Sequence, residues 1–247
     1  MKVAIAGAAG RMGRTLIDAV AADPELTLAC AFDAAGGQAG GLKIATDAAA
    51  VAQAEVVIDF TRPEGTLALL KHARAMVIGT TGFTEEDKDR IKDAAKRIPI
   101  VMAANFAIGV NTVYQLAERA ARILGDAYDV EIVEAHHHHK VDAPSGTALE
   151  LGRIVAKALG RDLAKVGSYG RKGDIGERKA REIGFHAIRG GDIVGEHTVI
   201  FAGTGERVEV TVRSQSRATY ANGALRAAKW LKGRPPALYA MADVLGL

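Results

Sequence analysis

The sequence predicts an α/β protein in which a doubly wound parallel sheet is followed by an α+β domain with a mixed or antiparallel sheet. Short apolar segments alternate with helical patterns over residues 1–107, an order that is typical of parallel sheets with helices on both faces. Residues 183–214 instead predict longer strands separated by glycine turns. The length of 247 residues is enough for two modest domains, each with its own core.

The composition is that of an ordinary globular chain, with 49% hydrophobic residues and a net charge of +3. This small excess of basic groups does not indicate a nucleic-acid partner. No apolar run approaches the ~18 residues of a transmembrane helix, and no signal peptide precedes the first strand. The single cysteine, Cys30, cannot form an internal disulfide, which fits a reducing compartment. We expect a cytoplasmic protein without a membrane partner.

The first predicted strand, residues 2–6, leads into a glycine-rich turn, Gly7–Gly13, which opens a helix. Its GxxGxxG spacing lets the backbone turn tightly and approach a pyrophosphate at the helix N-terminus. The second strand, residues 26–32, ends in Asp33, 20 residues past Gly13, where an acidic residue should hold the ribose hydroxyls. These features together predict a Rossmann-type domain that binds a nicotinamide dinucleotide. A tight turn without a ligand is the alternative.

The residue after Asp33 bears on the choice of cofactor. It is Ala34, and no basic residue follows directly. The Asp33 carboxylate would repel a 2′-phosphate unless a cation compensated for it, and Arg11 and Lys43 are the nearest candidates in sequence. We therefore expect NADH to serve at least as well as NADPH.

Three further strands continue the predicted parallel sheet, at residues 55–60, 76–78 and 99–102. Pro63 suits the first turn of the helix after the first of them. Thr84 is a predicted cap for a charged surface helix that has acids at its start and bases at its end.

Small and polar residues follow two of these strands. Ligands in an open parallel sheet bind beyond the carboxyl ends of the strands, so Gly79–Gly82 and Ala103–Phe106 should border the nicotinamide. Asn105 could hydrogen-bond its carboxamide and Phe106 could shape its pocket. Ordinary turn chemistry and core packing are the alternatives for these residues.

Residues 134–148 bring several reactive side chains together in a predicted strand end, loop and helix start. On a strand, His136 and His138 would face one way, and His137 and His139 the other. Histidine binds or relays protons near neutral pH. Charged imidazoles or a dry site would lower the pKa of Lys140, which could then donate a proton.

A helix start follows this histidine–lysine run. Ser145, Gly146 and Thr147 offer free N–H groups and two hydroxyls, which predict a pocket for a substrate carboxylate. The four histidines could instead be a tag scar, a solvated loop or a metal site. Adjacent strand positions give at most two ligands on one face, and no HExxH spacing is present, so we expect no metal.

The remaining segments suggest how the chain is divided. A helix from Gly109 should lead into the second domain, where the glycine-rich residues 165–182 form either a lid or a plain mobile loop. The strands of residues 183–214 should form an antiparallel meander. One face of it should pack on helices, and the other could pair with another subunit. We expect residues 1–107, completed by 217–247, to bind the dinucleotide, and residues 108–216 to bind substrate and form the oligomer.

Six motifs occur in order along the chain: GAAGRMG at 7–13, DFTRPEG at 59–65, GTTGF at 79–83, AANF at 103–106, HHHHKVDAPSGTA at 136–148 and GDIVGEH at 191–197. They closely resemble the 4-hydroxy-tetrahydrodipicolinate reductase family from end to end. The histidine–lysine stretch is the most specific of them.

The resemblance implies a homotetramer that reduces 4-hydroxy-tetrahydrodipicolinate to tetrahydrodipicolinate with loss of water, in lysine and diaminopimelate biosynthesis. Carried over by position, His136 is the catalytic donor or acceptor and Lys140 the proton donor. The implied substrate contacts are His137, Gly146 and Thr147. The implied cofactor contacts are Gly7, Ala8, Ala9, Gly10, Arg11, Met12, Asp33, Gly79, Thr80, Thr81, Ala103, Ala104, Asn105 and Phe106. Some members carry arginine where this chain has Ala34, which bears on recognition of a 2′-phosphate.

Two other classes of function stay open from the residues alone. One is a regulator that senses the dinucleotide without chemistry, although no helix with a basic face for DNA is evident. The other is a metal hydrolase that uses residues 136–139.

Overall fold

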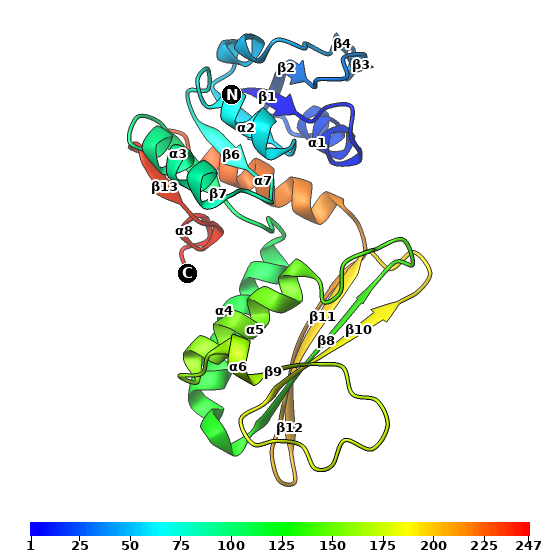
Figure 1. Cartoon of the computed structure of the whole chain (residues 1–247). Coiled ribbons are helices and arrows are strands. Elements are labelled where there is room, and N and C mark those ends of the chain that lie inside the picture. Colours follow the sequence, from blue (N-terminus) through cyan, green and yellow to red (C-terminus); the bar gives the residue numbers. More distant parts are fainter. The chain divides into compact units, whose positions relative to one another are not determined.

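The computed structural model describes all 247 residues, which form two compact units. The first comprises Met1–Ile108 and Arg217–Leu247, and the second comprises Gly109–Ser216. Each unit is built around its own sheet (Figure 1). The second unit is thus an insertion in the chain of the first.

The first unit contains a six-stranded sheet in the order β13-β7-β6-β5-β1-β2, and every neighbouring pair is parallel. Its strands are β1 (Lys2–Ala6), β2 (Thr27–Phe32), β5 (Val56–Asp59), β6 (Met76–Ile78), β7 (Pro99–Met102) and β13 (Ala237–Tyr239). From β1 the chain adds β2 on one side and β5 to β7 on the other. The carboxyl end of β1 is therefore the topological switch point, where ligands bind in such sheets.

Helices cover both faces of this sheet. The elements around the strands are α1 (Arg11–Ala22), β3 (Gln38–Ala39), β4 (Leu42–Lys43), the 3-10 helix η1 (Ala48–Gln53), α2 (Pro63–Leu69), α3 (Glu85–Ala95), α7 (Ala218–Trp230) and α8 (Met241–Leu245). Val3 and Ile5 of β1 pack in one cluster with α1, α7 and α8. Ala4 and Ala6 pack in a second cluster with η1, α2 and α3. Burial on both faces explains why these strands are apolar throughout.

The second unit contains a five-stranded mixed sheet in the order β12-β11-β8-β10-β9. Its strands are β8 (Asp129–His136), β9 (Gly167–Tyr169), β10 (Ile183–Arg189), β11 (Gly195–Ala202) and β12 (Arg207–Ser214). β11 is antiparallel to β8 and β12, whereas β10 is parallel to β8 and β9. The predicted antiparallel meander is therefore wrong for β10. The turn after Arg189 does not close a hairpin, because β8 lies between β10 and β11.

Helices pack on one face of this second sheet (Figure 1). They are α4 (Ile108–Leu124), α5 (Gly146–Ala158) and the short α6 (Leu163–Val166), with a 3-10 turn, η2 (Gly125–Ala127), after α4. Ile132, Phe185 and Phe201 of the sheet and Val113 and Leu151 of the helices are at most 5% exposed and form the core. Part of the predicted loop 165–182 is thus regular, since it includes the end of α6 and all of β9.

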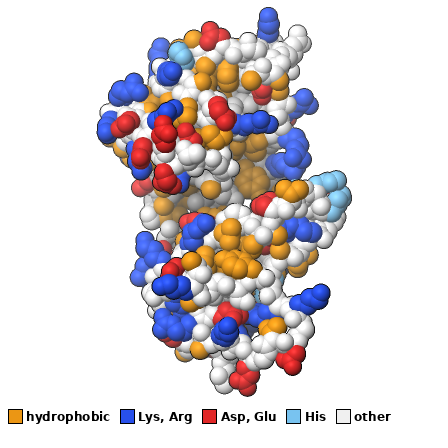
Figure 2. Space-filling view, viewed as in Figure 1, with side chains coloured by type: hydrophobic (Ala, Val, Ile, Leu, Met, Phe, Trp, Pro, Cys, Tyr) orange, Lys and Arg blue, Asp and Glu red, His pale blue; other side chains and the backbone are white.

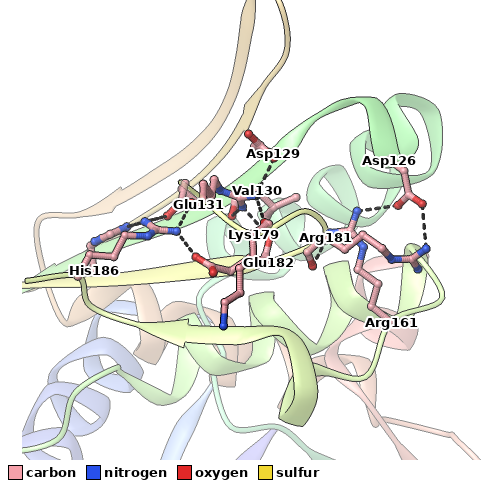
Figure 3. A network of polar contacts seen from close by, with 11 residues as sticks. Asp126, Asp129, Val130, Glu131, Arg161, Lys179, Arg181, Glu182 and His186 are labelled. Atoms are coloured by element: carbon pink, nitrogen blue, oxygen red, sulfur yellow. Dashed lines mark hydrogen bonds and ion pairs between the residues drawn. The ribbon is translucent and has the colours of Figure 1, made fainter. Parts of the chain in front are cut away.

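The rest of that loop is tied to the opposite face of the sheet by Glu131 of β8 (Figure 3). The Glu131 carboxylate accepts two hydrogen bonds from Arg171, at 2.8 and 2.9 Å, and one each from Arg178 Nε at 2.9 Å and His186 Nε2 at 2.7 Å. Arg171 also pairs with Glu182. Burial alone would raise the pKa of Glu131, but the hydrogen bonds from Arg171, His186 and Arg178 lower it to about 2.

Basic and acidic side chains are interspersed over the face of the molecule shown in Figure 2. None of the helices combines the length and the apolar character that crossing a bilayer requires.

Candidate active site

The glycine turn of the first unit leaves its backbone bare at the N-terminus of α1. Gly7 has φ +83°, and a Cβ there would lie 2.5 Å from the Phe60 carbonyl oxygen. A Cβ on Gly13 would lie 2.1 Å from the Gly7 oxygen. The N-cap of α1 is Gly10, which offers no capping side chain. The first N–H groups of the helix therefore face no competing side-chain oxygen, as a phosphate site requires.

Asp33 fixes this turn from the end of β2. Its Oδ2 accepts a hydrogen bond from the Ala9 N–H at 3.1 Å, and its Oδ1 accepts one from Ala35 at 3.0 Å. A pocket of about 550 Å³ opens here, and it is lined by Gly7, Gly10, Phe32, Asp33, Ala34, Ala35, Phe60, Thr61, Arg62, Glu64 and Gly65. Arg62 is the cation of this pocket, whereas neither Arg11 nor Lys43 lines it.

Asp59 is a buried carboxylate that sequence reasoning did not single out. It accepts hydrogen bonds from the hydroxyls of Thr61, Thr66 and Thr80 at 2.6, 2.5 and 3.1 Å, and from the Thr61 N–H at 3.0 Å. Burial raises its pKa, although these hydrogen bonds oppose the shift. Asp59 thus joins the carboxyl ends of β5 and β6. The only sequence signal was an acidic residue that ends an apolar strand with threonines nearby.

The loops after β6 and β7 lie beside each other, since the Ala103 N–H donates to the Ile78 carbonyl at 3.2 Å. A side chain at Gly79 would displace the Phe60 ring, because a Cβ there would lie 2.3 Å from it. Phe106 is 1% exposed and meets Phe60 edge-on, with 5.9 Å between ring centroids. The Phe106 ring thus belongs to the core cluster of the first unit, and its contact with the nicotinamide stays a prediction.

The other predicted cofactor contacts lie around the same sheet end. Asn105 Oδ1 accepts a hydrogen bond from the Ala107 N–H at 2.9 Å, so this amide shapes its own loop. Thr80 is buried, whereas Thr81 and Ala104 are exposed. Arg11 and Met12 form the first turn of α1, next to Ala8 and Ala9 of the glycine turn.

In the second unit, β8 ends at His136, so the alternation predicted for residues 136–139 is wrong beyond that point. The rings of His138 and His139 instead lie against each other, with 3.8 Å between centroids. Both are exposed, and a group of histidine side chains protrudes at the edge of the face in Figure 2. His137 is partly buried, and its carbonyl accepts a hydrogen bond from the Lys140 N–H at 3.1 Å.

His136 is 9% exposed and is bonded to a carboxylate of its own strand. Its Nδ1 lies 2.5 Å from Oε2 of Glu134, which is 1% exposed. Arg189, at the end of β10, donates to both Glu134 oxygens at 2.8 and 2.6 Å. Burial would raise the pKa of Glu134, but hydrogen bonds from Arg189 and His136 bring it below its usual value. The pKa of His136 is lowered by burial, which outweighs the carboxylate.

A second buried imidazole, His197 of β11, lies behind the first. The His136 and His197 rings meet edge-on, with 5.1 Å between centroids. His197 Nε2 is hydrogen-bonded to Ser145 Oγ at 2.9 Å, and its buried Nδ1 has no partner. Burial and the neighbouring His136 lower the pKa of His197 to about 4. His197 is therefore neutral, and it supports Ser145 rather than titrating near pH 7.

Ser145 caps α5. Its Oγ accepts a hydrogen bond from the Ala148 N–H at 3.2 Å, and its own N–H donates to Glu134 Oε1 at 3.1 Å. Apart from its chain neighbours and the backbone of its own helix, no heavy atom lies within 4 Å of the place that a Cβ on Gly146 would occupy. Thr147 is hydrogen-bonded to Tyr114, a residue of α4 whose pKa burial raises to about 12. The helix start is thus fixed from behind and open at Gly146.

Lys140 occupies the loop between β8 and α5. Its side chain is 20% exposed, and its Nζ donates to Asp142 Oδ1 at 2.8 Å. The second unit therefore brings His136, Lys140 and Ser145 onto one strand–loop–helix segment. Sequence reasoning missed Glu134, Arg189 and His197. Only Glu134 had a clear signal, because residues two apart on a strand, such as Glu134 and His136, share a face. No group of three or more histidine, cysteine or carboxylate side chains in the chain is arranged to hold a metal ion.

Residues 1–106 match the family described as dihydrodipicolinate reductase, N-terminus, and residues 109–245 match dihydrodipicolinate reductase, C-terminus. The 4-hydroxy-tetrahydrodipicolinate reductase of Aromatoleum aromaticum is 58% identical over 264 aligned residues, covering 100% of this chain and 96% of that protein. The enzyme of the same name from Thiobacillus denitrificans is 55% identical, with 100% and 99% covered.

Among solved structures, the dipicolinate-bound dihydrodipicolinate reductase of Paenisporosarcina sp. TG-14 matches with a TM-score of 0.75 at 23% identity, covering 98% of each chain. A diaminopimelate dehydrogenase of C. glutamicum matches with a TM-score of 0.60 at 14% identity, covering 98% of this chain and 93% of that one. These two matches bear on the fold, whereas the family assignment depends on the sequence matches. The chain belongs to the dihydrodipicolinate reductase family, whose members are NAD(P)H-dependent oxidoreductases of lysine and diaminopimelate biosynthesis.

Proposed function

We propose that the first unit binds the nicotinamide dinucleotide and that the second unit binds the dicarboxylate substrate and supplies the proton. The reaction is the reduction of 4-hydroxy-tetrahydrodipicolinate to tetrahydrodipicolinate with loss of water. The observation that carries these roles is the grouping of a buried histidine, a lysine and an open helix start on residues 136–147. When bound, the nicotinamide ring supplies the hydride.

The proton for the reduced bond comes from Lys140. Its ammonium group is held by Asp142 at 2.8 Å and remains 20% exposed, so it is positioned and still reachable by a substrate. His136 is kept neutral by burial, and its Nδ1 is engaged by Glu134. Its Nε2 is then the nitrogen that accepts or returns a proton on the substrate side.

The substrate carboxylate binds at the start of α5. Gly146 and Thr147 present first-turn N–H groups, which favour an anion together with the helix dipole. His137 adds a hydrogen bond from the adjoining loop. Ser145 keeps this helix start in place through its bonds to Ala148 and His197.

Substitution of the two proposed catalytic residues tests these roles. His136→Ala and Lys140→Ala should each lower kcat by about 10²–10⁴, the usual size of general acid–base catalysis, while the Kd for NADH stays within about twofold. The assay follows NADH absorbance with freshly made product of dihydrodipicolinate synthase. His139→Ala is the control, because this exposed neighbour has no assigned role. An equal loss of NADH binding in both variants would contradict the assignment.

We propose that NADH is at least as good a cofactor as NADPH. Asp33 and Ala34 line the pocket beside the glycine turn, an arrangement that suits ribose hydroxyls better than a 2′-phosphate. Arg62 in the same pocket is the cation that would let NADPH bind as well. The ratio of kcat/KM for the two cofactors measures the preference, and Arg62→Ala should weaken NADPH more than NADH. A strong preference for NADPH would refute this proposal.

We further propose a homotetramer that forms through the sheet face opposite α4 and α5. This face carries Val133, Ile188 and Ile200, and Ile188 is 52% exposed. Light scattering should give four times the mass of 25.9 kDa, and Ile188→Glu should reduce it, since a charge in an apolar interface is costly. A monomer in the wild type would refute the assembly.

The single buried cysteine, Cys30, is consistent with a reducing compartment. The cytoplasm is accordingly the location that we propose, and fractionation of cells followed by immunodetection tests it.

A further inference from the structure

The protonation pattern of His136 is set by its contact with Glu134. Arg189 donates to both oxygens of this carboxylate, so Glu134 is a hydrogen-bond acceptor on each side. The proton of the shared 2.5 Å contact therefore belongs to His136 Nδ1. The other ring nitrogen, Nε2, keeps a lone pair and has no hydrogen-bond partner within the chain.

Glu134 is fully occupied by donors from three elements. Besides His136 of β8 and the two bonds from Arg189 of β10, it accepts the Ser145 N–H at the start of α5 at 3.1 Å. A carboxylate oxygen has two lone pairs, so four donors saturate the group. The His136 ring cannot rotate without leaving a nearly fully buried charge short of a donor, which costs free energy.

Arg189 extends the same arrangement to the lysine. Its Nη2 donates to the Asp142 carbonyl oxygen at 2.7 Å as well as to Glu134. The Asp142 side chain in turn holds Lys140 Nζ at 2.8 Å. Hydrogen bonds therefore connect His136 through Glu134 and Arg189 to the main chain of Asp142, whose side chain bonds Lys140.

We propose that the Glu134–Arg189 ion pair positions both reacting groups: Glu134 fixes the tautomer and ring orientation of His136, and Arg189 fixes the loop that carries Lys140. Glu134 and Arg189 are positioning residues, since each acts through another side chain. The inference rests on the proposed function, because it takes His136 and Lys140 to act on the substrate.

A purely structural ion pair is the competing explanation, and β8 offers a matched control for it. Glu131 lies three residues before Glu134, on the opposite face of the strand. It accepts two hydrogen bonds from an arginine of its own, Arg171. Glu131→Gln thus removes a comparable carboxylate from the same strand without touching the histidine–lysine segment.

The first experiment compares kcat and its pH profile in Glu134→Gln, Glu131→Gln and wild-type enzyme. The carboxamide has only one acceptor oxygen, so it cannot serve Arg189 and His136 as the carboxylate does. We expect kcat to fall about 10- to 100-fold in Glu134→Gln, with the KM for NADH within about twofold. The acid limb should move to lower pH, because Lys140 and Arg189 then face His136 without the compensating anion. Glu131→Gln should keep the wild-type profile.

The second experiment is a double-mutant cycle. If Glu134 acts through His136, kcat of the Glu134→Gln/His136→Ala protein should equal that of His136→Ala within about threefold. Losses that multiply would overturn the claim that Glu134 acts through His136.

Arg189→Lys keeps the charge and gives up the two-bonded geometry, so it replaces Glu134→Gln if that protein does not fold. Because Arg189→Lys loosens the loop that carries Lys140, the kcat of this variant should fall at least tenfold. Raising the pH should not restore it. If both variants kept the wild-type kcat and pH profile while His136→Ala was strongly impaired, the positioning role alone would be overturned. An unimpaired His136→Ala enzyme would overturn the proposed function, and this inference with it.

Discussion

His197 shows how a single buried residue can make the second unit sensitive to pH. It is 4% exposed, its Nδ1 is without a partner, and its pKa is lowered from 6.5 to about 4. The folded chain therefore resists protonation at this site, while the unfolded chain takes up the proton at its ordinary pKa.

We predict that the free energy of unfolding falls as the pH is lowered from about 7 to about 4. In this window the unfolded state binds more protons than the folded state. The difference between the folded and unfolded pKa values of His197 corresponds to at most about 3 kcal/mol of stability. His197→Gln lacks the titrating group, so its stability should depend less on pH. Urea unfolding at several pH values measures both proteins. Parallel curves for the two would contradict the prediction.

Residue patterns in the sequence predicted some residues of the candidate site and missed others for a definite reason. Gly7, Asp33, His136 and Lys140 could be picked out because each stands in a short local pattern. Arg189 could not, since it is 55 residues from Glu134 and only the parallel pairing of β10 with β8 brings them together.

The helix starts at Thr84 and Ser145 are both capped by a side chain, but their other contacts differ. Thr84 caps α3 in a reciprocal capping box with Asp87, at 3.1 and 3.0 Å, and its helix lies far along the chain from the histidine–lysine segment. Ser145 caps α5 within that segment and also bonds His197. Local sequence predicted both helix starts, because capping depends on neighbours within one turn.

We predict that Thr84→Ala and Ser145→Ala each lower the free energy of unfolding by about 0.5–2 kcal/mol, the usual cost of a lost N-cap. Only Ser145→Ala should also raise the KM for the dicarboxylate, since the start of α5 loses its hold on His197 as well. Thermal unfolding and steady-state kinetics separate the two effects. A raised KM for the dicarboxylate in Thr84→Ala would contradict this prediction.

Strand pairing was the weaker part of the prediction at this scale. Alternating Val208, Val210 and Val212 indicated a strand correctly, but no local feature tells which strand is its neighbour. The glycine turn at residues 190–191 suggested a hairpin, whereas β10 pairs in parallel with β8. Pairing between distant segments is decided by burial of the whole sheet, which a single sequence does not display.

At the scale of the whole molecule, the first unit is made of two separate pieces of chain. Arg217–Leu247 contributes β13 at the edge of the sheet and α7 on one face. Ala221, Ala224 and Ala228 of α7 are fully buried in the cluster that also holds Val3 and Ile5. The second unit, in contrast, is one continuous segment with its own core.

We predict that a chain ending at Ser216 loses NADH binding, because the sheet of the first unit would lack its edge strand and expose one face. A fragment of residues 109–216 should still show cooperative unfolding by circular dichroism, since its core is complete. Fluorescence titration with NADH gives the first result. Retained NADH binding by the truncated chain would contradict the prediction.

The same division sets an order for folding during synthesis. Residues 1–108 are synthesised first, yet α7, β13 and α8 of that unit appear only after the inserted segment has been made. The inserted segment can therefore complete its core while residues 1–108 still lack part of theirs. Until residues 217–247 emerge, the nascent chain exposes part of an apolar sheet face, and surface of this kind favours aggregation during that interval.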